Sequence, residues 1–427
     1  MQRALGIVAA GTGEGKTLVG LAFARALARA RYAVMPFKIG PDFLDARLYE
    51  HACGVRARNL DLYLDGQERV RTELAQAHGA VVIEGMMGLF DGDDAGETSS
   101  AHVLALADVP TLLVVDGWRM SQSAAAVAIG CATMEPRVRL RGVVLNRCGG
   151  AAHERAVRRA CEAVGIPLLA TLPYDASWTM PERHLGLVVE RSDAFDAMLD
   201  AVADALAAQV DLHEWFGAPQ APRAAVASAA GPRIAVAADD ALWFTYPQTL
   251  DALAALAEPV PFSPLRDRAL PPGTRGIWLG GGYPELHGAA LEGNGTMREA
   301  LRAAARDGLP IYAECGGLMY LADRLDTAHG SHAMAGVLRG ATTIAQPRLT
   351  IGYRDTYASR ATILDDAGDR VRGYEFHYAT STLEEPPAYD GPGDRGAVSE
   401  NVLASFIHRR FFPGDRTIWR FVERCAR

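Results

Sequence analysis

Short apolar runs alternate with Ala-rich helical segments along this sequence, and the alternation limits the fold more than any other feature. In the first half, strands are predicted at residues 5–9, 33–38, 80–83, 111–115, 142–145 and 168–172. Helical patterns such as LVGLAFARALARARY lie between them. Strands that alternate with helices build a parallel sheet covered on both faces. We therefore predict an α/β domain with a parallel sheet.

A second α/β region is predicted after a linker. The chain has 427 residues, more than one hydrophobic core usually takes, so two domains are expected. Residues 217–232, GAPQAPRAAVASAAGP, have no apolar period and are predicted to be the linker. Strands are then predicted at 234–237, 276–279 and 310–313, with further short strands beyond 335. The expected domains are residues 1–216 and 233–427.

Composition and net charge limit the classes of binding partner and the cellular compartment that we expect for this protein. The chain is 49% hydrophobic and 22% charged, with a net charge of −8, which is typical of a soluble globular protein without the basic surface of a nucleic-acid binder. No apolar run is long enough to span a bilayer, and no signal peptide is recognised. The six cysteines form no CxxC pair, which favours reduced thiols. We expect a cytoplasmic protein with no nucleic-acid or membrane partner. A homodimer is a possible oligomeric state.

The first predicted strand runs into a glycine-rich turn, AAGTGEGKT, at residues 9–17. In a P-loop, backbone N–H groups at a helix N-terminus surround phosphate oxygens, a lysine reaches the β- and γ-phosphates and a hydroxyl binds Mg²⁺. The strict motif has glycine where this chain has Ala10. The alternative is a βα turn without a ligand. We predict an ATP site made of Gly11, Gly13, Gly15, Lys16 and Thr17.

Acidic residues follow two later strands of the same predicted sheet. Asp42 and Asp45 lie in FKIGPDFLD, and Glu84 and Asp91 lie in VVIEGMMGLFDG. The carboxyl ends of parallel strands meet at one edge, where Mg²⁺ ligands of an ATP site belong. Each acid alone could be a solvated loop residue. Asn146 ends another strand and is a candidate for a purine edge or for turn capping.

In the second half, the segment YAECGGLMYL places Cys315 between an apolar strand and a helical run, directly before Gly316 and Gly317. A nucleophile on such an elbow needs close approach, a base and N–H donors for an oxyanion. The N–H of Gly316 is the expected first donor. The glycine-rich segment WLGGGYPEL, residues 278–286, is expected to supply the second. The alternative is a buried structural thiol.

The base is expected to be a histidine far from the cysteine in sequence. Two histidines end strand-like runs, His377 in GYEFHY and His408 in LASFIHRRFF. A single histidine is more often structural than catalytic, so one of the two is expected to be a bystander.

These motifs resemble a known family. AECGGLMYL, LGGGYPEL, GYEFHYA and ASFIHRRF resemble the class I glutamine amidotransferase domain of the cobyrinic acid and hydrogenobyrinic acid a,c-diamide synthases. KIGPDFLDARLY, ARNLDLYL and IEGMMGLFDG resemble the N-terminal half of that family, which is related to dethiobiotin synthetase. The resemblance covers nearly the whole chain apart from the linker. It implies a P-loop domain followed by a flavodoxin-like amidotransferase domain.

The resemblance also implies an activity. Cys315 and His408 would hydrolyse glutamine, with Gly316 at the oxyanion, and ammonia would amidate two acetates of a corrin macrocycle after ATP·Mg²⁺ activates them. Thr17, Asp42 and Glu84 would hold Mg²⁺, and Asp42, Asp45 and Asp91 would act at the transferred phosphate. Many class I enzymes carry a glutamate two residues after the histidine, where this chain has Arg410. Backbone carbonyls, Glu375 or another acid would then orient His408.

Other functions remain as alternatives. An enzyme that diamidates nickel sirohydrochlorin and cobyric acid synthase share parts of the pattern, and the motif AECGGLMYL with the short chain favours the a,c-diamide enzymes over the second. A regulatory P-loop ATPase is the alternative from another class, and the cysteine elbow argues against it. Four arginines form a hypothetical substrate-carboxylate set: Arg47, Arg56, Arg58 and Arg119.

Overall fold

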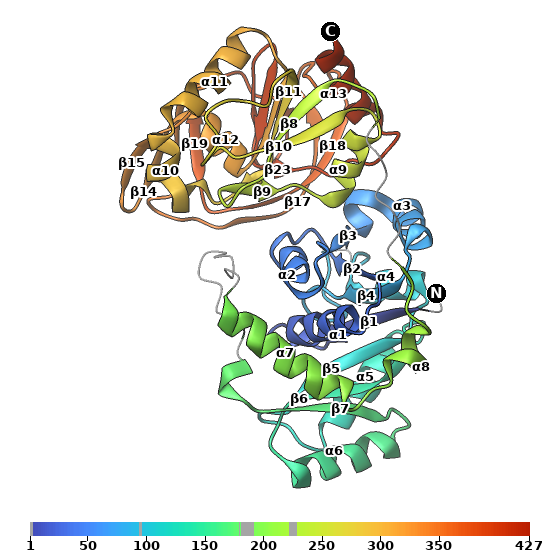
Figure 1. Ribbon diagram of the computed structural model, residues 1–427. Helices are drawn as coiled ribbons and strands as arrows, with labels where there is room; N and C mark the ends of the chain where they lie inside the picture. Colours follow the sequence, from blue (N-terminus) through green and yellow to red (C-terminus); the bar gives the residue numbers. More distant parts are fainter. Residues whose placement is uncertain (1–2, 94–95, 179, 181–191, 222–228) are drawn as a thin grey trace. The chain divides into compact units, whose positions relative to one another are not determined.

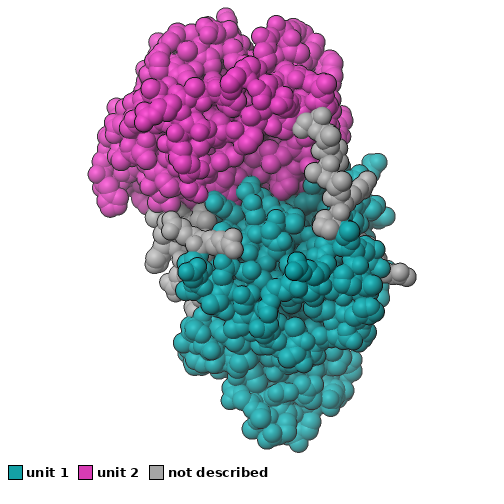
Figure 2. Space-filling view, viewed as in Figure 1, with its two compact units in different colours: residues 1–225 teal, residues 226–427 magenta. Residues whose placement is uncertain are grey.

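A computed structural model describes residues 3–93, 96–178, 180, 192–221 and 229–427 of the chain. The chain forms two compact units, residues 1–225 and 226–427, which are coloured separately in Figure 2. Residues 222–228, within the predicted linker, lie outside the described part. No described helix is both long and apolar enough to cross a membrane.

Unit 1 is built on a seven-stranded sheet whose described strands all run parallel. The order is β3-β2-β4-β1-β5-β6-β7 (Figure 1). The six predicted strands correspond to β1 (Ala4–Ala9), β2 (Val34–Ile39), β4 (Ala80–Glu84), β5 (Thr111–Asp116), β6 (Leu140–Cys148) and β7 (Leu168–Pro173). The edge strand β3 (Arg58–Leu60) was not predicted, because three residues carry no readable period.

Helices cover both faces of this sheet, as the predicted fold class requires. Successive residues of β1 point to opposite faces, so Leu5 and Ile7 join one core while Ala4 and Val8 join the other. The first core contains α1 (Lys16–Arg29), α2 (Leu44–Cys53), α7 (Asp193–Ala207) and α8 (Leu212–Phe216). The second contains α3 (Leu62–Gln76), α4 (Ser100–Ala107), α5 (Ala124–Met134) and α6 (Ala151–Ala163).

Unit 2 has a six-stranded central sheet with the order β10-β8-β11-β13-β22-β21. Its five parallel strands follow the 2-1-3-4-5 order of a flavodoxin-like fold, which confirms the predicted class. They are β8 (Arg233–Ala237), β10 (Glu258–Phe262), β11 (Thr274–Leu279), β13 (Ile311–Glu314) and β22 (Val402–Ser405), with β21 (Ala397–Val398) antiparallel at the edge. Helix α11 (Gly295–Arg306) packs on one face, and α9 (Pro247–Ala254) and α13 (Arg416–Ala426) pack on the other.

Smaller sheets complete unit 2 and place the site residues. β9 (Leu242–Phe244) pairs with β12 (Gly281–Gly282). A four-stranded sheet contains β14 (Ala322–Thr327), β15 (Gly330–Ala333), β16 (Leu338–Thr343) and β19 (Thr380–Leu383). Another contains β17 (Thr350–Ala358), β18 (Arg370–His377), β20 (Tyr389–Asp390) and β23 (Ile407–His408). Because β23 follows β22 after one residue, the chain leaves the central sheet at Ser405 and pairs with β18 at His408.

Candidate active site

Cys315 occupies the sharp turn between β13 and α12 (Gly316–Leu321). Its φ of 47° and ψ of −105° lie outside the regions that side chains normally adopt, so the turn stores backbone strain. The N–H of Cys315 donates to the carbonyl of Ser405 at 2.8 Å, which ties the elbow to the end of β22. The residue is 5% exposed. A strained non-glycine residue at a strand-to-helix elbow is the geometry predicted for a nucleophile.

Glycines pack the neighbouring chain directly onto this elbow. A Cβ on Gly316 would lie 2.8 Å from the backbone nitrogen of Gly282, and one on Gly317 would lie 2.5 Å from the carbonyl oxygen of Leu279. Only glycine fits at either position, because real Cβ atoms do not approach other atoms so closely. The glycine-rich segment that follows β11 and includes β12 therefore lies against the cysteine turn, where the second oxyanion donor was predicted.

His408 and His377 lie in different environments. A Cβ on Gly281 would lie 2.5 Å from Cε1 of His408, so this ring packs against the same glycine segment. His377 instead stacks on Phe406 with ring centroids 4.1 Å apart, and its Nδ1 lies 2.8 Å from the carbonyl oxygen of Ala379. The contacts support His408 as the base and a structural role for His377.

The acid beside His408 is Glu314, the residue before the cysteine. Its Oε2 lies 3.4 Å from Nδ1 of His408, and both side chains are 2% exposed. Glu375, one of the predicted candidates, is engaged elsewhere: it accepts from Arg354 and from the N–H of Asp394. Its role as the orienting acid is therefore not supported by the geometry.

The charges around Cys315 favour the neutral thiol. Burial raises its pKa most, and the carboxylates of Glu285, Glu314 and Asp394 raise it further, against a backbone hydrogen bond from Gly316. Burial also raises the pKa of the half-buried Glu285 to about 7. A protonated thiol needs a base to become a nucleophile.

In unit 1, the glycine-rich turn joins β1 to α1 as the P-loop prediction requires. Gly13 and Gly15 have φ values of 87° and 101°, and a Cβ on Gly15 would lie 2.2 Å from the amide nitrogen of Asn146. That nitrogen donates to the carbonyl of Glu14 at 3.0 Å, so Asn146 supports the loop. Lys16 Nζ donates to the carbonyl of Gly11 at 2.9 Å. Burial and the ammonium of Lys38 lower the pKa of Lys16.

A buried network connects the loop to the acids of the next strands. Glu84 Oε1 accepts from the Thr17 hydroxyl at 2.7 Å and from Lys38 Nζ at 2.9 Å, and its Oε2 accepts from Tyr49 at 2.9 Å. Lys38 also pairs with Asp45 at 2.9 Å. Burial alone would lower the pKa of Lys38, but the two carboxylates raise it above the ordinary lysine value. Thr17, Glu84 and Asp45 are thus brought together around one buried cation.

The other two predicted acids lie beside this network and the loop. Asp42 Oδ1 accepts from the N–H of Asp45 at 2.8 Å. Asp91 Oδ2 accepts from the N–H of Gly88 at 2.8 Å, and a Cβ on Gly88 would lie 2.4 Å from the carbonyl oxygen of Ala10. The P-loop thus has Asp91 at its first turn, while Asp42 precedes α2.

The oxygen donors at the loop fit Mg²⁺. The Thr17 hydroxyl and the Glu84 carboxylate are 2.7 Å apart. No cluster of three or more His, Cys, Asp or Glu residues suited to a metal occurs within the described ranges. A nucleotide-bound Mg²⁺ needs none, because phosphates and waters supply most of its ligands.

Sequence reasoning missed three residues of these sites: Lys38, Tyr49 and Glu314. Lys38 lies inside the apolar strand β2, and a lysine among buried residues signals a buried ion pair. Glu314 directly precedes the nucleophile and was treated only as part of the turn. Tyr49 carries no signal of its own, because it continues the apolar face of α2.

A hollow of about 710 Å³ adjoins the P-loop at the ends of β5, β6 and β7. Trp118 and Tyr174 line it with ring centroids 4.6 Å apart, and their side chains are 52% and 51% exposed. Arg147, also in the lining, donates to the carbonyl of Gly13 at 3.4 Å. A half-exposed aromatic pair beside a phosphate loop is suited to a flat ring.

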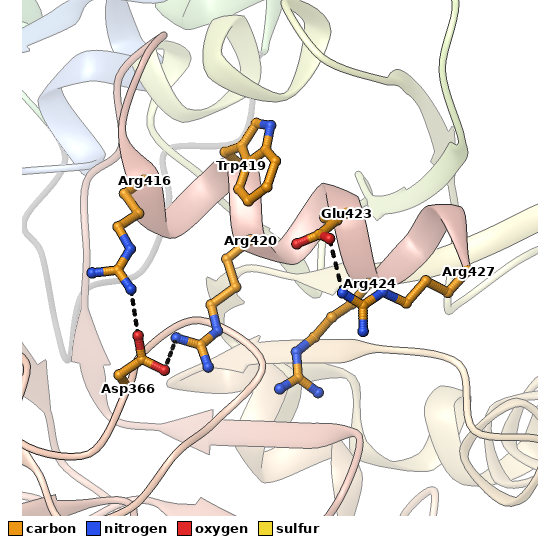
Figure 3. Close-up of a pocket in the computed structure, with 7 residues that line it drawn as sticks. All are labelled: Asp366, Arg416, Trp419, Arg420, Glu423, Arg424 and Arg427. Atoms are coloured by element: carbon orange, nitrogen blue, oxygen red, sulfur yellow. Dashed lines mark hydrogen bonds and ion pairs between the residues drawn. The ribbon is translucent and has the colours of Figure 1, made fainter.

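A smaller hollow of about 320 Å³ lies on α13 in unit 2. Figure 3 shows Arg416 and Arg420 directed to Asp366, and Arg427 directed to Glu423. None of the predicted site residues lines it.

Two of the four hypothetical substrate arginines are paired with acids. Arg58 pairs with Glu73 at 2.8 Å, and Arg56 pairs with Glu50 at 2.9 Å. Arg119 lines the hollow beside Trp118. This distribution leaves Arg119 as the member of the set nearest the P-loop hollow.

Comparisons with known proteins agree with both halves of the site. Residues 5–188 match the family described as the CobQ/CobB/MinD/ParA nucleotide binding domain, and residues 233–415 match the CobB/CobQ-like glutamine amidotransferase domain. A hydrogenobyrinate a,c-diamide synthase of Thermobifida fusca is 41% identical, with 96% of this chain and 94% of the relative covered. A cobyrinate a,c-diamide synthase of Listeria innocua is 35% identical, with 95% and 96% covered. A hydrogenobyrinate a,c-diamide synthase of Streptomyces coelicolor is 38% identical, with 98% and 96% covered.

Proposed function

The chain belongs to the family of cobyrinate and hydrogenobyrinate a,c-diamide synthases, and on this basis we propose that it amidates the a and c acetates of a corrin macrocycle with ATP and glutamine. It is a glutamine-hydrolysing carbon–nitrogen ligase of cobalamin biosynthesis. The observation that carries the proposal is the pairing, in one chain, of a P-loop with a strained cysteine elbow beside a buried histidine. A regulatory P-loop ATPase does not need a cysteine nucleophile with a histidine base.

Glutamine hydrolysis begins with proton transfer from Cys315. His408 takes the thiol proton, and the sulfur attacks the side-chain amide carbon of glutamine. The same histidine returns the proton to the leaving nitrogen, so ammonia departs and an acyl thioester remains. Water then attacks the thioester, which releases glutamate and restores the thiol. The raised pKa of Cys315 makes this base-assisted route necessary.

The oxyanion formed during attack needs fixed N–H donors. The N–H of Gly316 follows the nucleophile, and the N–H of Gly282 lies at the glycine contact with it. Backbone donors held by packing need no reorganisation when charge develops. Both donors depend on positions where only glycine fits, which is why the two glycine-rich motifs belong to one site.

ATP activates the acetate in the other unit. A carboxylate is a poor acyl donor because oxide is a poor leaving group, and transfer of the γ-phosphoryl group makes an acyl phosphate. Ammonia attacks the acyl carbon, and phosphate leaves with the carbon–oxygen electron pair. Gly11, Gly13, Gly15 and Lys16 would surround the phosphates, and Asp91 would lie at the reacting end with Asp42 and Asp45.

Mg²⁺ would be held by Thr17 and Glu84, with Asp42 as a further oxygen donor, and would neutralise charge on the phosphates. Lys38 holds Glu84 in place through its 2.9 Å contact. The hollow at Trp118 and Tyr174 is proposed for the nucleobase, and Asn146, which precedes the lining residue Arg147, holds the P-loop through the carbonyl of Glu14. An aromatic pair supplies stacking energy without choosing between bases.

The remaining expectations about substrate and compartment belong to this proposal. The relatives carry both cobyrinate and hydrogenobyrinate names, so cobyrinic and hydrogenobyrinic acids are the substrates to compare. The partners are then small molecules: the macrocycle, glutamine and ATP. All six cysteines are free thiols, which supports a reducing cytoplasm.

Mass spectrometry of the macrocycle tests the proposal. The enzyme is incubated with ATP, Mg²⁺ and glutamine, and cobyrinic acid, hydrogenobyrinic acid and nickel sirohydrochlorin are supplied in separate reactions. We expect two successive exchanges of a carboxyl oxygen for NH in one of the first two substrates. A change in nickel sirohydrochlorin alone would contradict the corrin assignment.

A further inference from the structure

His408 lacks an acid at the position where many class I enzymes carry one, and the local structure excludes a simple substitute there. That position is Arg410, whose guanidinium lies 5.1 Å from the ring centre of Tyr246. A cation cannot accept a proton from an imidazole or stabilise an imidazolium. Something else must therefore fix the tautomer of His408 when it acts as a base.

The carboxylate of Glu314 occupies the required place. Its Oε2 lies 3.4 Å from Nδ1 of His408, in a site where both side chains are 2% exposed. This distance suits an ion pair, and contacts of this kind commonly shorten when substrate binds. The contact is an ion pair rather than a formed hydrogen bond in this structure. Once Nδ1–H turns to the carboxylate, Nε2 is the nitrogen that receives the proton of Cys315.

Glu314 is itself held in position by two donors. Its Oε1 accepts from the hydroxyl of Tyr312 at 2.7 Å and from the backbone N–H of Arg409 at 2.9 Å. Arg409 is anchored in turn by a two-pronged pair with Asp365, at 2.7 and 2.9 Å. One oxygen of the carboxylate is thus fixed by protein donors, and the other is left facing the imidazole.

We propose that Glu314 is the positioning residue of the glutaminase site, in place of the acid missing at Arg410. The inference rests on the proposed function, because it assigns how His408 is prepared to deprotonate Cys315. Glu314 holds the imidazole with Nδ1–H outward from the thiol and stabilises the imidazolium that forms during attack. Glu314 and Cys315 are consecutive residues, so the turn that positions the nucleophile also positions the carboxylate that orients His408.

Other ionisable groups near the pair have different partners. Glu375 is paired with Arg354, and Asp394 accepts from the Ser405 hydroxyl at 2.7 Å. Glu285 acts on the thiol of Cys315. The groups on the elements packed around His408 are Glu285, Tyr312, Glu314, Tyr374, Glu375, Asp394, Arg409 and Arg410. Within the described part of the chain, the carboxylate of Glu314 lies in ion-pair contact with the imidazole.

The test measures glutamate release from glutamine against glutamine concentration for the full-length enzyme, so that kcat and KM are separated. Glu314→Gln keeps the shape of the side chain and removes its charge. We expect kcat to fall on the order of 100-fold, since loss of the orienting acid removes tautomer control. A residue that acts through the base lowers kcat and leaves KM for glutamine within about twofold, whereas a collapsed site would raise KM as well.

Two further variants separate positioning from folding. Glu314→Asp keeps the charge and shortens its reach, so we expect partial rescue, with kcat on the order of 10-fold below wild type. Tyr312→Phe removes one support and keeps the carboxylate, so its kcat should fall by less than that of Glu314→Gln. Amidation driven by added ammonium salts should be retained in all three variants, because it bypasses glutamine hydrolysis.

The outcomes distinguish this inference from the proposed function. If wild type releases no glutamate from glutamine, the proposed function itself falls. If wild type is active and Glu314→Gln keeps the kcat of wild type, the inference is overturned. Should Glu314→Gln not fold, Glu314→Asp decides: a rate equal to wild type would refute a positioning role.

Discussion

Gly281 in β12 packs against the ring of His408, and replacing this glycine by alanine should disable glutamine hydrolysis. The added Cβ would lie 2.5 Å from Cε1 of His408, whereas ordinary contacts begin at 3.4 Å. The added Cβ has little room to shift, because Cβ and Cδ2 of Phe244 also lie close to it, at 3.1 and 3.2 Å. The imidazole must therefore move by about 0.9 Å, the difference between these contact distances.

A displacement of that size has a predictable kinetic effect. Misplacing a reacting group by about 1 Å costs on the order of 100-fold in rate, equal to about 2.7 kcal/mol in the barrier. Overpacking costs about 1–3 kcal/mol of stability, which a folded domain usually tolerates. Gly281→Ala should therefore fold and lose about two orders of magnitude in glutamine-dependent kcat/KM.

The assay follows glutamate release, beside amidation driven by added ammonium salts. Gly293→Ala is the matched control, because a Cβ there meets nothing within 4 Å. The control should keep both activities, and Gly281→Ala should keep only the ammonium-driven one. A folded Gly281→Ala enzyme within about threefold of wild type in glutamine hydrolysis would refute the placement of His408 against this strand, since a 1 Å shift should cost far more.

Two further predictions concern buried charges. Lys38→Met leaves the carboxylates of Glu84 and Asp45 without their shared cation. Unit 1 should then lose about 3 kcal/mol or more of its free energy of unfolding in urea, because breaking a buried ion pair leaves a buried charge without a partner. A loss below about 1 kcal/mol would mean that the pair is not buried in solution. Glu285 is charged above its pKa of about 7 and then raises the pKa of the Cys315 thiol, so Glu285→Gln should speed alkylation of Cys315 by iodoacetamide above that pH and not below it. An equal effect on both sides of neutrality would contradict this sign.

The control for Lys38→Met is an exposed pair on the same unit. Arg137 contacts Glu135 at 2.6 Å, and the arginine side chain is 68% exposed. Arg137→Ala should leave the urea midpoint of unit 1 unchanged within error, because solvent screens such pairs.

The sequence predicted the central sheets because their strands are continuous apolar runs. Residues 111–115, for example, are buried on both faces and need no partner to be recognised. Strand β3 escaped notice because it has three residues at the sheet edge. The short strands after residue 335 could be expected but not paired, since antiparallel register depends on contacts between distant segments.

The candidate sites were partly readable in the same way. Cys315 and the P-loop follow from local turn chemistry, which a short motif records in full. Glu314 and Lys38 act through contacts with residues far away in sequence, at positions 408 and 84. Such partners become visible only when strand order brings their ends together.

In the proposed reaction, nitrogen passes from the side chain of glutamine to the macrocycle, and isotopic labelling follows this transfer. Glutamine labelled in its side-chain nitrogen is supplied to wild type and to Cys315→Ala, with ATP, Mg²⁺ and the corrin acid. We predict labelled diamide from wild type, none from Cys315→Ala, and unlabelled diamide from Cys315→Ala when ammonium salts are added. Labelled product from Cys315→Ala, or unlabelled product from wild type in ammonia-free buffer, would contradict the account.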